Sequence, residues 1–130
     1  MPYFVDTNVA LYAFQDSPKS KRGSALLTGA TISVQVLNEF ANVCIRKLGY
    51  DQPTLDTLIA AIRAKVDMIE PVCETTHDLA RALAFRYRLS FYDSALLASA
   101  RLADCDVFYS EDLQDGLIIE GQLTVRNPFA

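Results

Sequence analysis

Short apolar runs alternate along the chain with longer stretches in which apolar residues recur at the spacing of a helix. The short runs, typical of buried strands, lie at residues 3–5, 31–33, 68–72, 106–109 and 123–125. The longer stretches predict helices at residues 7–14, 18–27, 34–48, 53–68, 75–87 and 93–102. Short strands that alternate with helices predict an α/β layer fold with a mainly parallel sheet flanked by helices.

The predicted helices differ in how much of their surface is apolar. In residues 34–48 the apolar positions form one stripe, made of Leu37, Phe40, Ala41, Cys44 and Leu48. Residues 93–102 are almost wholly apolar, so we expect that helix to be buried on most sides. Asp93 stands at its start, where an Asp side chain often caps the first turn. Thr75 with Asp78 resembles a capping box for the preceding helix.

Length and composition describe an ordinary globular chain. The 130 residues fit a single domain, residues 1–130, and the 51% of hydrophobic residues argues against disorder. No apolar run is long enough to span a membrane, and the N-terminus does not read as a signal peptide, so we expect a cytoplasmic protein. Cys44, Cys73 and Cys105 lack the spacing of a metal site or a disulfide framework and are expected to be reduced thiols in or near the core.

Acidic residues follow or face the ends of several predicted strands. Asp6 ends the first strand, and Asp112 follows the strand at 106–109, with Asp115 one helical turn later. Glu39 lies in the helix after the second strand, and Asp93 opens the apolar helix. Because the carboxyl ends of parallel strands meet at one edge of a sheet, which is where such folds bind ligands, we expect these acids to gather there.

Each acid has a structural explanation when it is taken alone. Asp6 and Asp93 could cap helices, and Asp112 and Asp115 could belong to a turn. Glu39 lies at the margin of the apolar stripe, but Asn42 and Val43 occupy the positions three and four residues later, so no cation is available locally.

Taken together, the acids favour a metal site. Several carboxylates at one edge repel one another and would have raised pKa values unless a cation neutralises them. Ligands that are all oxygen suit Mg²⁺ or Mn²⁺ rather than Zn²⁺. Such a metal would activate a water molecule and neutralise charge that develops on a phosphate. The single histidine, His77, is expected on an exposed helix face, so no Ser-His-Asp or Cys-His catalytic set is available.

The net charge of −4 is unusual for a protein that binds nucleic acid. Either nucleic acid is not the partner, or its phosphates are held by a bound metal or by local basic clusters. Three such clusters occur, and for each of them a solvated helix face is favoured over direct contact with RNA: Lys19, Lys21 and Arg22; Arg46 and Lys47; Arg86 and Arg88.

Five motifs in a fixed order, FVDTNVALY, SVQVLNEF, FYDSALLASA, YSEDLQDG and VRNPF, resemble those of the PIN-domain ribonucleases. Within that family the chain is similar to VapC-like toxins of type II toxin–antitoxin systems, over nearly its whole length. The family's four catalytic acids correspond to Asp6, Glu39, Asp93 and Asp112, of which Asp6, Asp93 and Asp112 would be metal ligands. Asn8 and Ser110 match polar positions that orient the carboxylates, and Asp115 is a further candidate for support.

The resemblance implies a PIN-like three-layer α/β/α sandwich and a specific activity. We expect endonucleolytic cleavage of RNA that depends on Mg²⁺ or Mn²⁺ and leaves 5′-phosphate and 3′-hydroxyl ends. The implied partners are the RNA substrate, a cognate antitoxin protein and a second copy of the chain in a homodimer. Residues 17–31 are shorter than in many relatives, in a region that often contributes to the substrate groove and to antitoxin contacts.

Other protein classes also place carboxylates at the edge of a parallel sheet. A phosphatase of the haloacid dehalogenase type needs a second Asp two residues after the first, where this chain has Asn8. A phospho-receiver domain needs a lysine after its last strands, and residues 109–115 contain none. A PIN domain that binds RNA or an antitoxin without cleaving RNA stays open as an alternative.

Overall fold

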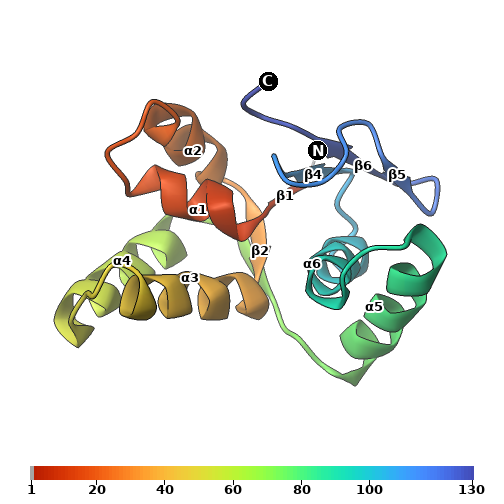
Figure 1. Cartoon of the computed structure of the whole chain (residues 1–130), viewed down its shortest axis with the longest axis horizontal. Coiled ribbons are helices and arrows are strands. Elements are labelled where there is room, and N and C mark those ends of the chain that lie inside the picture. The colour runs from red at the N-terminus through yellow and green to blue at the C-terminus, as the bar shows by residue number, and fades with distance from the viewer. Residues whose placement is uncertain (1) are drawn as a thin grey trace.

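Residues 2–130, described by a computed structural model, form one six-stranded sheet with helices packed against it (Figure 1). The strands are β1 Tyr3–Val5, β2 Thr31–Ser33, β3 Met68–Glu70, β4 Val107–Tyr109, β5 Ile118–Ile119 and β6 Leu123–Arg126. The helices are α1 Thr7–Ala13, α2 Ser20–Leu27, α3 Val34–Arg46, α4 Gln52–Lys65, α5 Glu74–Tyr87 and α6 Phe91–Leu102. None of these helices combines the length and apolarity that a membrane span requires.

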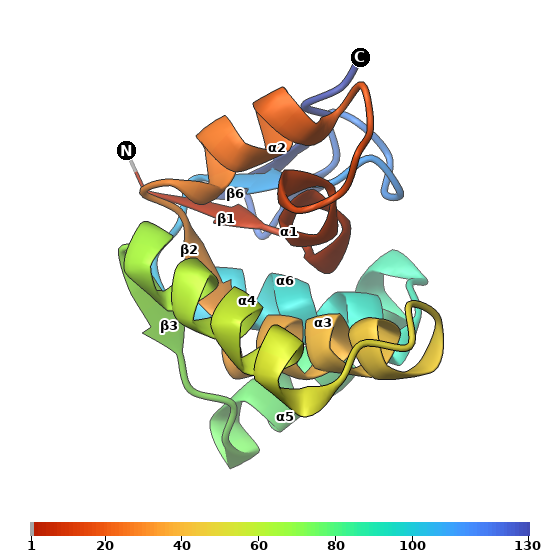
Figure 2. The same ribbon diagram turned by 90° about the vertical axis from the view of Figure 1, so that its left-hand side faces the viewer.

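The strand order is β3-β2-β1-β4-β6-β5, with β1 near the middle. All neighbouring pairs are parallel except β5 and β6, which are antiparallel. Figure 1 shows α1 to α4 on one side of β1 and β2, and α5 and α6 on the other side. In Figure 2, which faces the left-hand side of that view, α3 and α4 lie in front of α5 and α6. The predicted α/β/α sandwich with a mainly parallel sheet is therefore confirmed.

The core is centred on the middle strands and on α6. Phe4 of β1 and Phe108 of β4 are buried and stack with their ring centroids 5.2 Å apart. In α6 every residue from Ser94 to Ala100 is buried, which confirms the prediction of an almost fully buried helix. A helix held on most sides in this way gives its first turn a fixed position against the sheet.

The prediction that Asp93 caps α6 is wrong. The helix begins at Phe91, and the cap is Ser90, whose hydroxyl oxygen accepts a hydrogen bond of 3.1 Å from the backbone N–H of Asp93. Ser and Asp are equally good capping residues, so the sequence alone does not choose between them. Asp93 lies in the first turn of α6, where its carboxylate is free for another role and its charge suits the positive end of the helix dipole.

Other helix boundaries also differ from the predictions. The start of α5 is a capping box of Cys73 and Thr76, not of Thr75 and Asp78. Cys44 and Cys105 are buried as expected, but Cys73 is exposed at this helix start, so the expected position in or near the core is wrong for it. Helix α4 begins after its cap Asp51 and ends at Lys65, since the chain turns extended at Val66 to enter β3. Helix α3 stops at Arg46 rather than at residue 48. The two-residue strand β5 was not predicted.

Replacing either of two serines in the α6 region with alanine should change the free energy of unfolding in different ways. Ser90→Ala removes the cap and should lower the free energy of unfolding by about 1 kcal/mol. Ser99, buried in the same helix, has a hydroxyl with no hydrogen-bond partner among the described residues. Ser99→Ala should therefore be neutral or stabilising. Urea unfolding of both variants checks this, and a larger loss for Ser99→Ala than for Ser90→Ala would contradict the assigned cap.

Candidate active site

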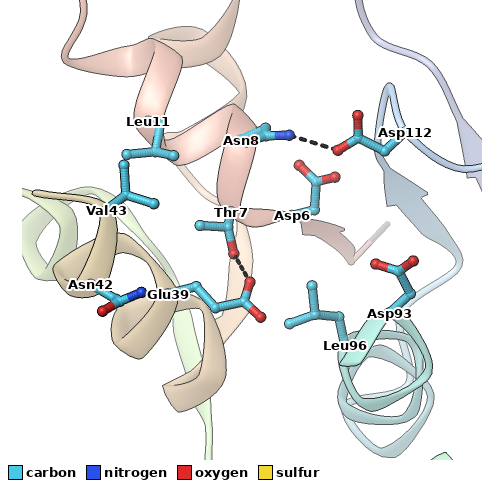
Figure 3. Close-up of a pocket in the computed structure, with 10 residues that line it drawn as sticks. All are labelled: Asp6, Thr7, Asn8, Leu11, Glu39, Asn42, Val43, Asp93, Leu96 and Asp112. Carbon is cyan, nitrogen blue, oxygen red and sulfur yellow. Dashed lines mark hydrogen bonds between the residues drawn. The ribbon is translucent and has the colours of Figure 1, made fainter. Parts of the chain in front are cut away.

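A pocket of about 280 Å³ opens at the carboxyl edge of the sheet (Figure 3). The structure brings all four predicted catalytic acids together in its wall. The residues that line it are Asp6, Thr7, Asn8, Leu11, Glu39, Asn42, Val43, Asp93, Leu96 and Asp112. The pocket therefore joins residues that are up to 106 positions apart in the chain, from Asp6 to Asp112.

The parallel sheet explains why these acids meet. Asp6 directly follows β1, and Asp112 lies just after β4, which pairs with β1 in parallel. Glu39 comes from the middle of α3, the helix that leaves the end of β2. Asp93 lies in the first turn of α6 and faces the other acids from across the pocket (Figure 3). Ligand sites of parallel sheets form at this edge for the same reason.

Asp6 is the most buried of the four acids, with 6% of its surface exposed. Its carboxylate caps α1 by accepting a hydrogen bond of 3.3 Å from the backbone N–H of Val9. The pKa of Asp6 is raised from 3.8 to about 6, mainly by burial and also by the nearby charges of Asp112 and Glu111, against the opposing effects of Ser110 and the Val9 amide. A charged carboxylate at this position is therefore unfavourable in the protein alone.

Neutral donors orient two of the other acids. The hydroxyl of Thr7 donates to Glu39 Oε1 at 2.5 Å, and the Gln35 amide donates to Glu39 Oε2 at 2.8 Å. The Asn8 amide donates to Asp112 Oδ2 at 2.6 Å. These bonds fix where each carboxylate points without neutralising its charge.

The backbone around Asp112 is held as well. The hydroxyl oxygen of Ser110 accepts hydrogen bonds from the backbone N–H groups of Asp112, at 3.1 Å, and Leu113, at 3.4 Å. Asn8 and Ser110, the two predicted supporting residues, thus contact Asp112 through its side chain and its backbone respectively.

Within residues 2–130, no positive side chain lines the pocket beside these acids. The pocket lining contains no Lys, Arg or His. The ion pairs among residues 2–130 are Lys19–Glu111, Arg81–Asp78 and Arg101–Glu120, and none of them includes an acid of the pocket. The four negative charges are therefore uncompensated by the described part of the protein.

Asp115 lies outside the pocket. Its Oδ1 accepts a hydrogen bond of 3.1 Å from the backbone N–H of Asn127, so it joins the turn after β4 to the end of β6. The next residue, Gly116, has a φ of +89°, a backbone conformation that favours glycine. His77 is exposed as expected and packs against Phe91, with ring centroids 5.4 Å apart and no part in the pocket.

Two features of this region were not predicted. Asn42 lines the pocket beside Glu39, and the signal was its position three residues later on the same face of α3. Glu111 is an acid next to Asp112, but it pairs with Lys19 instead of facing the pocket. Burial alone would raise the pKa of Glu111, but the hydrogen bonds from Lys19 and Tyr12 outweigh it and lower the pKa below its ordinary value.

The carboxylates are chemically suited to a hard divalent cation, but they lie too far apart to bind one ion directly as they stand. Carboxylate oxygens are the ligands that Mg²⁺ and Mn²⁺ prefer, and a cation would relieve the cost of charging Asp6. Among residues 2–130, however, no three acidic, histidine or cysteine side chains are close enough to hold an ion as they stand. Mg²⁺ usually keeps several of its waters, so water molecules can bridge part of this spacing.

The raised pKa of Asp6 predicts how stability depends on pH in the absence of metal. The folded protein binds the Asp6 proton more tightly than the unfolded chain, so this contribution is fully present below pH 3.8 and is lost as the pH rises to about 6. At pH 7 the Asp6→Asn variant, which keeps a capping side chain, should be more stable than the original by up to about 3 kcal/mol.

Thermal unfolding in EDTA between pH 4 and pH 7 measures this difference. The advantage of Asp6→Asn should shrink steadily toward pH 4. An advantage that is equal at both ends of this range, or a loss of stability at pH 7, would show that Asp6 is not held in an unfavourable charged state.

The fold and sequence have known counterparts. The sequence profile of the PIN domain matches residues 3–114. No curated protein matches the chain in sequence.

Three solved structures share the fold. The chain is 22% identical to a protein in a toxin–antitoxin complex from Klebsiella pneumoniae, with a TM-score of 0.71, covering 99% of this chain and 98% of that one. It is 22% identical to VapC20 from Mycobacterium tuberculosis, a toxin that cleaves the sarcin-ricin loop, with a TM-score of 0.65 and coverage of 82% and 86%. It is 17% identical to a chain of VapBC2 from Rickettsia felis bound to a DNA fragment of its promoter, with a TM-score of 0.65 and 98% of each chain covered.

The profile match covers most of the chain, and the parallel sheet with acids at its carboxyl edge agrees with the resemblance seen in the sequence motifs. The chain belongs to the PIN domain family.

Proposed function

We propose that this protein is a metal-dependent endoribonuclease and the toxin of a type II toxin–antitoxin module. The observation that carries this proposal is the pocket in which Asp6, Glu39, Asp93 and Asp112 meet, with no positive side chain of the described part of the chain lining it. An arrangement of this kind has no structural benefit, because like charges repel, but it suits a site that recruits a cation. The similarity in fold to the RNA-cleaving toxin VapC20 supports RNA as the substrate.

In this proposal Asp6, Asp93 and Asp112 hold Mg²⁺ or Mn²⁺. When bound, the metal supplies an activated water molecule and stabilises negative charge on the phosphate. Asp6 is the least mobile of these three acids, since it is buried and its carboxylate accepts a hydrogen bond from the first turn of α1. Asp93 approaches from the buried helix α6, so its backbone has little freedom to move away.

Glu39 has a different role from the three proposed metal ligands. Both of its oxygens already accept hydrogen bonds, from Thr7 and Gln35, and these bonds fix the plane of the carboxylate. We assign it the role of orienting the attacking water and accepting its proton through a remaining lone pair. Asn8 keeps Asp112 directed into the pocket.

The same pocket bears on the partners of the protein. An acidic pocket without its own cations is a suitable receptor for an arginine side chain, because guanidinium pairs with carboxylates through two parallel hydrogen bonds. We therefore propose an antitoxin that inserts basic residues here. We also propose a homodimer, on the sequence resemblance alone. The structural neighbour from Klebsiella pneumoniae, a toxin–antitoxin complex, supports an antitoxin partner.

Asp93→Asn tests catalysis separately from folding. The cap of α6 is Ser90, so the substitution leaves the helix start intact and removes only a charge and a ligand oxygen. We expect RNA cleavage in Mg²⁺ or Mn²⁺ to fall by at least about 100-fold, while the free energy of unfolding changes by less than about 1 kcal/mol. The assay is cleavage of cellular RNA by the purified chain, with mapping of the ends.

The matched control is Glu74→Gln, which removes an exposed acid from the first turn of the neighbouring helix α5. It should leave cleavage unchanged, and EDTA should stop cleavage by the unaltered protein. Full activity of Asp93→Asn would exclude the proposed metal site. An unaltered chain that binds RNA or its antitoxin but never cleaves RNA would favour the non-catalytic alternative.

A further inference from the structure

The loop that carries Asp112 is bonded to α1 at two successive residues. The Asn8 amide donates to Asp112 Oδ2 at 2.6 Å (Figure 3), and the Tyr12 hydroxyl donates to Glu111 Oε1. Asn8 and Tyr12 are four residues apart and therefore lie on the same face of α1. One face of a short helix thus contacts two neighbouring acids of the loop.

The second oxygen of Glu111 is used as well. Lys19, in the segment between α1 and α2, donates from Nζ to Glu111 Oε2 at 2.5 Å. The same ammonium group lies 4.9 Å from the centre of the Tyr12 ring and 5.2 Å from that of Phe129. Phe129 in turn packs edge-on against Tyr12, with centroids 5.3 Å apart. Tyr12 and Lys19 therefore both bind the Glu111 carboxylate, and Phe129 packs against these two side chains.

Glu111 differs in kind from the acids of the pocket. It does not line the pocket, both of its oxygens accept hydrogen bonds, and its charge is matched by Lys19. Only 17% of its side chain is exposed, so its bonds to Lys19 and Tyr12 are partly shielded from water and from screening by salt. These bonds restrain the residue immediately before Asp112.

We propose that Tyr12, Lys19 and Glu111 form a latch that positions Asp112 for metal binding, with Phe129 packed over it. Glu111 is thus a positioning residue and makes no contact with metal or RNA. The inference rests on the proposed function, in which Asp112 is a metal ligand. A metal site binds its ion best when the carboxylates are held in place, whether they bind directly or through water, so a looser loop should weaken metal binding.

Two substitutions open the latch from opposite sides. Glu111→Gln removes the charge that Lys19 binds, and Tyr12→Phe removes the hydroxyl while keeping the ring that packs against Phe129. In both variants we expect the Mg²⁺ concentration for half-maximal cleavage to rise about tenfold. Saturating Mg²⁺ should restore most of kcat, and the KM for RNA should not change, because neither residue touches the substrate.

Amide hydrogen exchange gives a readout that needs neither metal nor RNA. In the metal-free protein, residues 110–115 should exchange faster in Glu111→Gln and in Tyr12→Phe than in the unaltered chain. This measurement keeps the latch testable even if the unaltered chain proves unable to cleave RNA, in which case the proposed function fails and the latch is judged by exchange alone.

The matched control is Glu120→Gln, which breaks the Arg101–Glu120 ion pair of 3.0 Å, similarly shielded and outside the pocket. It should change neither the Mg²⁺ dependence nor exchange at residues 110–115. The latch is overturned if exchange in Glu111→Gln and Tyr12→Phe matches that of the control. It is also overturned if Glu111→Gln abolishes kcat at every Mg²⁺ concentration while Tyr12→Phe has no effect, since Glu111 would then act directly in the site.

Discussion

Uncompensated negative charge at the carboxyl edge of the sheet is the constraint on which the rest of this structure depends. Parallel pairing of β1 and β4 places whatever follows these strands side by side, and here Asp6 and Asp112 follow them. Glu39 and Asp93 approach the same pocket from α3 and α6, and no Lys, Arg or His among the described residues lines it. The pKa of Asp6, raised by burial to about 6, expresses the cost of holding this charge without a cation.

Helix α1 links the parts of the site, although it is only seven residues long. Its cap is Asp6, Thr7 at its start donates to Glu39, and Asn8 donates to Asp112. One turn later Tyr12 reaches Glu111. Most of the orientation in the pocket is therefore provided by one short helix, which is anchored because Val9, Ala10 and Leu11 are buried in the core. This arrangement separates the residues that carry charge from the neutral residues that direct them.

Much of the fold could be predicted from the sequence, and the exceptions have physical reasons. Strand and helix positions follow from apolar spacing, and the meeting of four distant acids follows from the edge rule for parallel sheets. The cap of α6 was misassigned because Ser90 and Asp93 are chemically equivalent caps separated by three residues. Strand β5 has two residues and no periodic signal of its own. Pattern alone also could not separate Glu111 from Asp112, because the distinction depends on Lys19, 92 positions away in the chain.

The most direct test of the central claim is anomalous diffraction from crystals of the protein soaked in Mn²⁺. The account predicts one dominant peak inside the pocket, bonded directly or through water to the carboxylates of Asp6, Asp93 and Asp112, and no such peak in crystals of Asp93→Asn. A fully occupied Mn²⁺ site elsewhere with an empty pocket, or an unchanged peak in Asp93→Asn, would contradict it.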